Sequence, residues 1–463
     1  ESQENDLKAT GLQELVYDMP NKSVSLTSEN SLVAAQMQST WMTCPLIHLV
    51  HDEDGRMISA SCRGPGRLQH IDPETGEPVV TAGWEHELRK HPDPEGSGLE
   101  LIELEKRAYI RQHGADAGLG AESIILWYHE LADDERRGEG ESSRFQPVRL
   151  RARDQVALIS PEMNAETGDL EIQFRESPAL EHASAANRSP HPLNPAAGNP
   201  QSDPAATGLA TDEHPLKVVA DRILVHVSQQ GELDEAHVDE IFTSGRVQVT
   251  QPNDNPADTL ELTGESLNLK NQSDNEQVVE LRGEPAIIKT GEVKIEARQI
   301  GFDRASNFAT VTGRGLLTLP VKRSLEGEEL PEPQLLDIWW QEKMQFDGRT
   351  AKFFGDVDAK LQDSELRCQE MKVELTDRIS FADEDAARPD GIEVHHVFCR
   401  DGVEILNNRY EGRKLKEKFR GHFWEFSLNQ VTGKMEARGK GSINVWRRSD
   451  DNRAPLGMNV GGR

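Results

Sequence analysis

Apolar and polar residues alternate along much of the segment from residue 217 to residue 375. Clear examples are Ile223, Val225 and Val227, and further on Val293 and Ile295. A period of two places alternate side chains on opposite faces of a sheet, so this pattern predicts strands with one apolar face. Glycines punctuate the strands at Gly245, Gly264, Gly283, Gly301, Gly313 and Gly348. Many short strands at such spacing are typical of an all-β barrel, sandwich or stacked sheet.

The same alternation divides the chain into β modules separated by irregular segments. Residues 178–216 are rich in Ala, Pro, Asn and Ser and have no periodicity, which predicts a disordered linker or insertion. Residues 449–463 are expected to form an unstructured tail. The expected organisation is therefore one or more modules over 12–177, the linker, a module over 217–381, and the truncated start of another over 382–448.

Three passages of the sequence, at 49–71, 300–319 and 426–446, repeat one phrase. Each reads strand, polar turn, strand, Gly-x-Gly and strand, with Gly66, Gly315 and Gly441 in equivalent places. The first two passages continue into strands that carry Trp84 and Trp340, whereas the third stops before its tryptophan strand, which suggests that the natural chain continues. Repeats of one supersecondary unit with an open apolar face stack on their neighbours to bury that face.

Composition narrows the classes of function. The chain has 463 residues and a formal net charge of −29. Binding to duplex nucleic acid depends on Lys and Arg that neutralise phosphates, so this balance argues against a nucleic-acid partner. The hydrophobic content of 35% is modest and favours sheets with one apolar face over strands buried on both faces.

Two of the four cysteines, Cys44 and Cys62, flank an acidic turn centred on Glu53. A hairpin centred on that residue places the two cysteines opposite each other, which predicts a disulfide and an oxidising compartment. The alternative is a pair of small buried hydrophobic residues, because free cysteine is often buried. The remaining pair, Cys368 and Cys399, forms no CxxC motif, and neither does any other pair.

Segment 217–319 resembles the OstA-like domain of the lipopolysaccharide-transport bridge proteins. The matching residues are ADRI at 220–223, GRVQVTQ at 245–251, LTGESLNL at 262–269 and FDRASNFATVTGRGLL at 302–317. Segment 346–375 matches the pattern again with FGDV at 354–357, and residues 12–130 and 392–446 match more loosely through the repeat. The chain departs from a simple bridge protein in its length, its acidity, its several modules and its 178–216 insertion.

The resemblance implies a stack of antiparallel β-jelly-roll modules whose two sheets form a bent V. It also implies acyl chains of lipopolysaccharide, or of a similar amphipathic lipid, between the sheets, and modules that dock end to end. The expected function is a non-enzymatic periplasmic bridge of the cell envelope that carries lipid toward the outer membrane. The expected partners are therefore such a lipid and other OstA-like modules.

Motifs for catalysis, phosphate binding and metal binding do not stand out. The Gly-x-Gly sequences lack the third glycine of a dinucleotide loop, and no GxxxxGK[ST], GxSxG or HExxH occurs. His395 and His396 are adjacent, so in a strand they point to opposite faces and cannot bind one metal together. We therefore expect no enzyme activity, no cofactor and no metal.

The alternation places one set of residues on the predicted interior face, as core or as contacts for acyl chains. The set is Ile223, Val225, Val227, Val247, Val249, Leu267, Leu269, Val293, Ile295, Phe302, Leu317, Leu319, Trp340, Met344, Phe346, Val357 and Val373. Two alternatives to a lipid carrier stay open at this point. One is a structural envelope protein with a closed core, and the other is a polysaccharide-acting enzyme on a β-helix.

Overall fold

The computed structural model is all-β in the part that it describes. Its described residues are 7–29, 31–37, 39–53, 56–73, 75–130, 145–161, 163–176, 215–229, 236–253, 255, 259–273, 276–324, 329–379, 393–411 and 414–448. Every regular element within them is a β-strand, which confirms the all-β prediction. Residues 178–214 of the expected linker and the tail over 449–463 lie outside this part. The chain forms two compact units, Glu1–Leu281 (unit 1) and Arg282–Arg463 (unit 2).

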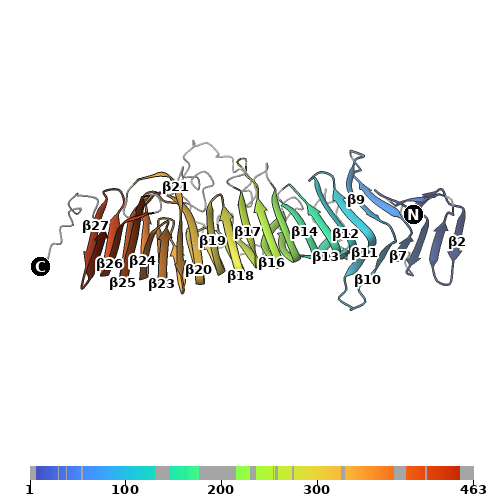
Figure 1. The fold of residues 1–463 in the computed structure, drawn as a ribbon. Helices are drawn as coiled ribbons and strands as arrows, with labels where there is room; N and C mark the ends of the chain where they lie inside the picture. The colour runs from blue at the N-terminus through green and yellow to red at the C-terminus, as the bar shows by residue number, and fades with distance from the viewer. Residues whose placement is uncertain are drawn as a thin grey trace, which may run out of the picture. The chain divides into compact units, whose positions relative to one another are not determined.

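Unit 1 starts with short strands and continues with longer ones (Figure 1). The strands are β1 (Leu7–Thr10), β2 (Glu14–Asp18), β3 (Ser23–Thr27), β4 (Val33–Met37), β5 (Thr40–Cys44), β6 (Leu46–His51), β7 (Met57–Arg63), β8 (Gly66–Ile71), β9 (Pro78–Trp84), β10 (Glu87–Pro92), β11 (Glu100–Gln112), β12 (Ala117–Glu130), β13 (Phe145–Ile159), β14 (Met163–Glu176), β15 (Leu216–Gln229), β16 (Ala236–Gln251) and β17 (Leu260–Ser273). β18 (Glu276–Thr290) runs across the boundary between the units.

The short strands of unit 1 form two hydrogen-bonded rows. Wing A contains β2, β3, β6, β7 and β10 in that order, and wing B contains β1, β4, β5, β8 and β9. β11 joins the two wings, because its residues 100–105 pair with β10 and its residues 109–112 pair with β9. Each later strand of unit 1 continues both wings, because it pairs with the preceding strand on both sides of the fold. The result is one folded sheet rather than two separate ones.

The fold between the wings is made by β-bulges at a corner in the antiparallel pairs of long strands from β11 to β17. The register shifts between Glu105 and Ala108 of β11, and the two skipped residues, Lys106 and Arg107, both have positive φ. β13 repeats this feature at 154–155 and β16 at 245–246. A bulge adds a residue to one strand and bends it, so a column of bulges at one level folds the whole sheet.

β14 and β15 run parallel, whereas the other strand pairs described are antiparallel. Leu170 lies beside Ile223, so β15 repeats the direction of β14. Parallel neighbours need a connection that returns to the starting end, which a tight turn cannot provide. The connection here contains residues 177–214, so the insertion joins strands that are neighbours. The antiparallel pairing also argues against the parallel β-helix of the enzyme alternative.

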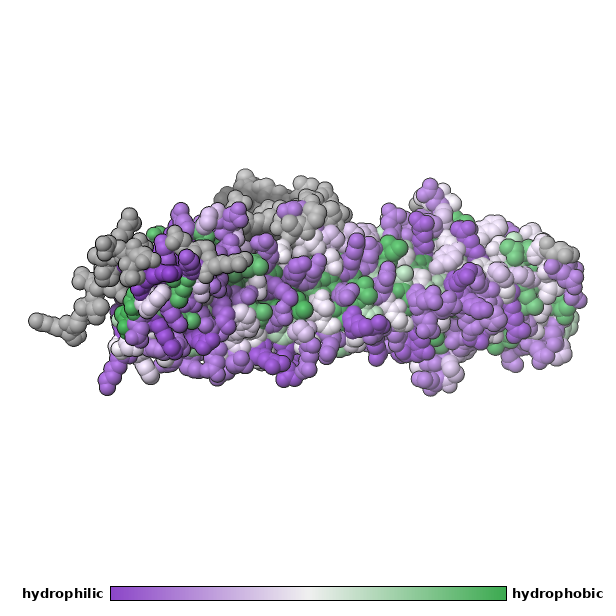
Figure 2. Space-filling view, viewed as in Figure 1, coloured by the Kyte–Doolittle hydropathy of each residue, from purple (hydrophilic) through white to green (hydrophobic). Residues whose placement is uncertain are grey.

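The interior face of unit 1 is closed near the corner. Leu104, Ile124, Ala152, Leu170 and Ile223 pair directly, one strand after the next, and none is more than 2% exposed. Burial of one such aliphatic side chain contributes about 1.5–3 kcal/mol, so this row forms the core of the unit. The outer surface is mainly hydrophilic on the side that Figure 2 shows, with smaller hydrophobic patches between the charged side chains.

Unit 2 repeats the folded arrangement. Its strands are β19 (Val293–Asp303), β20 (Phe308–Arg323), β21 (Glu329–Trp340), β22 (Lys343–Phe346), β23 (Thr350–Leu361), β24 (Ser364–Leu375), β25 (Val394–Glu411), β26 (Lys414–Asn429), β27 (Lys434–Arg438) and β28 (Ser442–Arg447). β20 pairs with β22 at one end and with β21 at the other, as β11 does with β10 and β9. β26 likewise pairs with β27 and β28, which are the last strands described.

Candidate functional site

The interior residues predicted from the sequence divide into a buried group and a half-buried group. Five are half-buried, all of them in unit 2: Val293, Ile295, Phe302, Leu317 and Phe346. The others are 8% exposed or less, and Ile223, Val247 and Trp340 are fully buried. The buried group therefore consists of core residues, and only the half-buried group is accessible to a ligand.

Unit 1 contains a half-buried apolar row that the sequence analysis missed. One step outward from the core row, Ile102, Leu126, Leu150 and Ile172 pair directly in series, and the row continues through Val225 to Ile241. Val225 is 5% exposed, and the others are half-buried. Directly paired residues of neighbouring strands point to the same face, so this tip row lies on the interior face.

Alternation in the sequence could have identified single members of this tip row, although not the row itself. Leu150 and Ile172 occupy alternating apolar positions in segments that read as strands, like the positions chosen after residue 217. The predicted interior residues all lie in the alternating segment from residue 217 to residue 375. Because partner strands place residues of the first half and of the second half on one row, the row becomes visible only once the register is known.

Unit 2 has half-buried interior residues at both ends of its strands. Phe302 pairs with Ala309, which pairs with Phe346 on the next strand. On the other wing, Ile295 pairs with Leu317. On the first wing the residues nearer the corner are buried, whereas on the other wing Leu319, which lies further out than Leu317, is also buried.

The outer face of β13, β14 and β15, on the side of the fold that continues wing A, is covered by paired charges. Arg151 donates to both carboxylate oxygens of Asp169, at 3.1 and 2.8 Å, and this holds the pKa of Asp169 below its usual value. Glu171 lies 3.1 Å from Arg149 and 3.6 Å from Arg222. Burial acts to raise the pKa of Glu171, but its hydrogen bond from a neighbouring glutamine and the charge of Arg149 outweigh it, so the pKa is lowered. These ion pairs therefore tie neighbouring strands of the sheet together.

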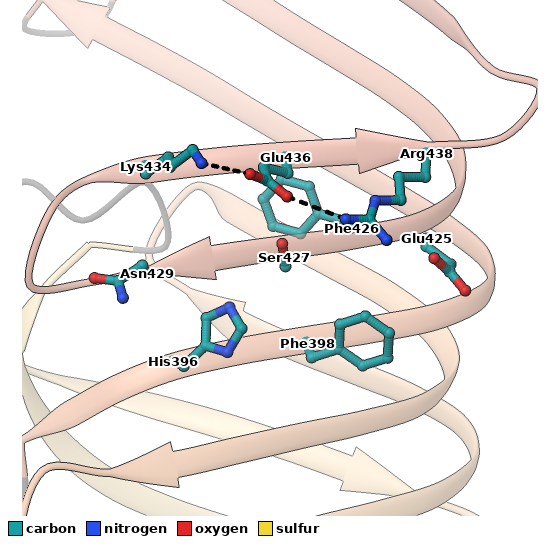
Figure 3. Close-up of a pocket in the computed structure, with 9 residues that line it drawn as sticks. All are labelled: His396, Phe398, Glu425, Phe426, Ser427, Asn429, Lys434, Glu436 and Arg438. Atoms are coloured by element: carbon teal, nitrogen blue, oxygen red, sulfur yellow. Dashed lines mark ion pairs between the residues drawn. The ribbon is translucent and has the colours of Figure 1, made fainter.

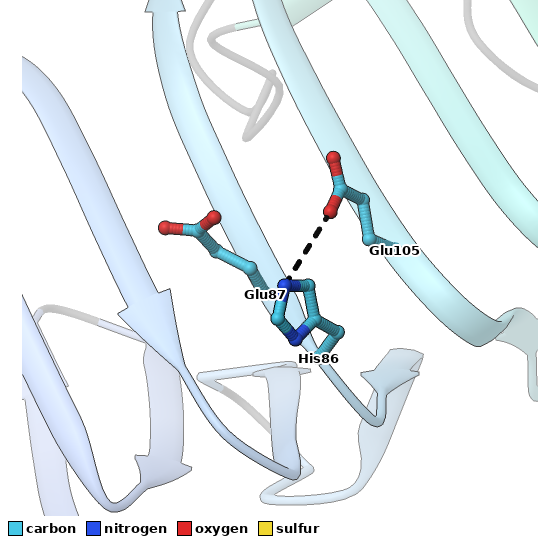
Figure 4. Close-up of side chains that lie close together, drawn as sticks. All are labelled: His86, Glu87 and Glu105. Atoms are coloured by element: carbon cyan, nitrogen blue, oxygen red, sulfur yellow. Dashed lines mark ion pairs between the residues drawn. The ribbon is translucent and has the colours of Figure 1, made fainter.

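One cluster, His86, Glu87 and Glu105, has the residue types of a metal site (Figure 4). Its carboxylates already have cationic partners, because Arg63 lies 3.1 Å from Glu87 and Arg89 contacts Glu105. Nε2 of His86 lies 4.0 Å from the Glu105 carboxylate. A metal ion would have to displace these guanidinium groups, so this cluster is better explained as part of the outer ion-pair network.

A cavity of about 350 Å³ lies on β25–β27 of unit 2 (Figure 3). It is lined by His396, Phe398, Glu425, Phe426, Ser427, Asn429, Lys434, Glu436 and Arg438. Most of these residues alternate with the buried core positions of the same strands, so the cavity opens on the outer face. Glu436 is paired with Lys434 at 2.6 Å and with Arg438 at 3.6 Å. The charged residues of β27 that line this cavity therefore form an ion-paired group.

All four cysteines are buried free thiols. The predicted placement of Cys44 opposite Cys62 in a hairpin is wrong, because the residue opposite Cys62 on β6 is Ile47. Cys44 and Cys62 nevertheless share a hydrogen bond, which together with burial raises the pKa of Cys62. Cys368 and Cys399 form a second such pair on β24 and β25, and burial and that hydrogen bond raise the pKa of Cys399. The Cys44–Cys62 disulfide remains a prediction.

A comparison of the sequence with known family models and with curated proteins finds no match. Within the described residues, no helix has the length and apolarity that crossing a membrane requires. The half-buried residues of the interior face are the candidate contacts for a ligand.

Proposed function

We propose that this chain is a non-enzymatic lipid-binding scaffold of the cell envelope, acting in the periplasm and similar to the OstA-like bridge proteins. Acyl chains of lipopolysaccharide, or of a similar amphipathic lipid, lie along the half-buried interior residues. The observation that supports this most is the tip row of unit 1, from Ile102 on β11 to Ile241 on β16.

The dimensions of the tip row suit an extended hydrocarbon chain. The row crosses six neighbouring strands, which at about 4.8 Å per strand gives a length of about 24 Å. Its members are branched aliphatic residues, and all of them except the buried Val225 are half-buried. Each CH₂ group that leaves water contributes about 0.8 kcal/mol, so a long acyl chain gains affinity here without polar contacts.

Two edge strands of the described sheet, β2 and β28, suit docking to other modules of the same kind. Leu15 and Tyr17 on β2 are 57% and 53% exposed, and Val445 on β28 is 54% exposed. Such exposed edge strands invite a further strand to pair with them. The proposal therefore includes end-to-end contact with other OstA-like modules.

A structural envelope protein with a closed core is the second candidate. The observation in its favour is the complete burial of the core row around Ala152, Leu170 and Ile223. This candidate assigns no role to the half-buried tip row and treats its partial exposure as ordinary apolar surface.

Photo-crosslinking tests the proposal. The chain is irradiated with a fatty acid that carries a diazirine near its methyl end, and the labelled peptides are mapped by mass spectrometry. We expect label in the strands that contain Leu126 and Leu150, and competition by unlabelled lipopolysaccharide. Label confined to the outer face, or not reduced by excess lipid, contradicts the proposal.

A further inference from the structure

A charged residue lies on the apolar interior face of unit 1, next in line to the tip row. Lys90 of β10 pairs directly with Ile102 on one side and with Ala60 on the other. Two residues earlier on the same strand, Leu88 pairs with the core residue Leu104 and is 5% exposed. Because alternate residues of a strand share a face, the side chain of Lys90 lies on the interior side of the sheet.

Glu100 of β11 forms an ion pair with Lys90. Its Oε2 lies 3.5 Å from the Lys90 ammonium, and the side chains of Lys90 and Glu100 are 11% and 22% exposed. The ammonium also donates to the carbonyl of Met57 at 3.4 Å. Glu100 shares the interior face with Ile102, two residues later on its strand. The β10 end of the tip row is therefore polar, but its two charges cancel.

Stability alone does not account for this ion pair. Moving two charges out of water costs desolvation free energy, and apolar residues of similar volume in their place are often neutral or stabilising. Oε2 of Glu100 is buried and accepts no hydrogen bond within the described part of the chain. A buried acceptor without a donor is costly, so a ligand that brings an O–H group would complete the site.

We propose that Lys90 and Glu100 select lipids with a neutral head group that carries a hydroxyl. The hydroxyl donates to Oε2 of Glu100 and accepts from the Lys90 ammonium, while the acyl chain extends over Ile102 toward Leu126. An anionic head group fits less well, because it meets the Glu100 carboxylate in a chain of net charge −29. This inference rests on the lipid binding of the proposed function and adds the class of head group.

Displacement of the photo-crosslinkable fatty acid from the full chain tests this preference. The competitors have acyl or alkyl chains of matched length: 1-lauroylglycerol and dodecyl glucoside carry hydroxyls, methyl laurate carries none, and laurate is anionic. We expect a hydroxyl-bearing competitor to displace the probe at about tenfold lower concentration than methyl laurate or laurate, as for a hydrogen bond to a charged group. The better of the two hydroxyl-bearing lipids shows whether a glycerol or a sugar head group fits.

A double variant locates the preference. Lys90→Met combined with Glu100→Leu removes both charges together and nearly keeps the side-chain volume, so its melting temperature should stay near that of wild type. It should bind the hydroxyl-bearing lipids and methyl laurate equally. Lys270→Met combined with Glu240→Leu removes an outer-face pair whose charged atoms lie 3.2 Å apart, and this control should keep the preference.

The possible failures are distinguishable. If the wild-type chain does not capture the probe, the proposed lipid binding is contradicted. Equal competition by all four lipids, stronger competition by laurate, or a preference that the Lys90→Met, Glu100→Leu variant retains overturns the head-group inference and leaves lipid binding in place. The wild-type series can overturn the inference by itself, so the test does not depend on the folding of the variant.

Discussion

At the scale of single residues, the outer face shows how an acidic chain keeps its sheet together. Asp169 and Arg151 lie on neighbouring strands and form a two-point hydrogen-bonded ion pair whose side chains are 26% and 22% exposed. Charge-assisted pairs of this geometry are stronger than single contacts at an open surface. The pair therefore makes a measurable contribution to the stability of unit 1.

Asp169→Asn should lower the free energy of unfolding at pH 7 by about 1 kcal/mol. The pKa of Asp169 is lowered in the folded state, so its stabilisation is present above the unfolded pKa of about 3.9 and is lost as pH falls through the folded value. Urea unfolding between pH 7 and pH 3 should show the variant converging on wild type in acid. A constant difference across that range contradicts the assignment, and Glu166→Gln, at an exposed site on the same strand, is the control.

The cysteine prediction also belongs at this scale. With oxidised glutathione as oxidant, the thiols of Cys44 and Cys62 should form one disulfide and release two molecules of reduced glutathione. Closing a loop of this length stabilises a folded state by about 3 kcal/mol in the chain-entropy model. Non-reducing peptide mapping should find the two peptides linked, and recovery of both as alkylated free thiols after oxidation counts against the prediction.

At the scale of elements, the corner explains why glycine occupies the repeated positions. Gly315 lies directly against the indole of Trp340, and a Cβ there would also lie 2.8 Å from the carbonyl oxygen of Glu296. Backbone cannot move aside as easily as the end of a flexible side chain can. The repeated Gly-x-Gly is therefore a packing requirement of the fold.

Gly315→Ala should destabilise unit 2 by about 1–3 kcal/mol, the usual range for overpacking a core. Thermal melting followed by circular dichroism measures the change. Gly114→Ala is the matched control, because it lies in a turn with no atom near its Cβ position. A Gly315→Ala protein as stable as the control variant would show that the indole has room to move.

Alternation and repeats in the sequence were sufficient to predict the strands, but not the corners between them. Each corner depends on residues such as Lys106, Arg107, Asp154 and Gln155, which adopt positive φ although their residue types rarely do. Their conformation is imposed by pairing on both sides, which no local pattern reveals. The tip row was missed for a related reason, because Leu126 joins it only through strand pairing.

At the scale of the whole molecule, the interior face of each unit combines buried rows with half-buried ones. The buried rows supply stability, and the half-buried rows leave aliphatic side chains partly accessible on the interior face. In unit 1 these two parts lie side by side on one strand, since Ile124 is 1% exposed and Leu126, two residues later on the same face, is half-buried. β12 therefore carries a core residue, Ile124, next to a proposed lipid-contact residue, Leu126, and the two roles can be tested separately.

The most direct test of lipid binding on the interior face measures melting and lipid capture for three variants of β12. Ile124→Asp should unfold unit 1, because a buried unpaired charge costs several kcal/mol. Leu126→Asp should keep a melting temperature near that of wild type and lose capture of the photo-crosslinkable fatty acid, and Ile125→Asp, on the outer face, should keep both. If Leu126→Asp captures lipid as wild type does, or loses capture only together with its fold, the interior face is a closed core and lipid binding there is contradicted.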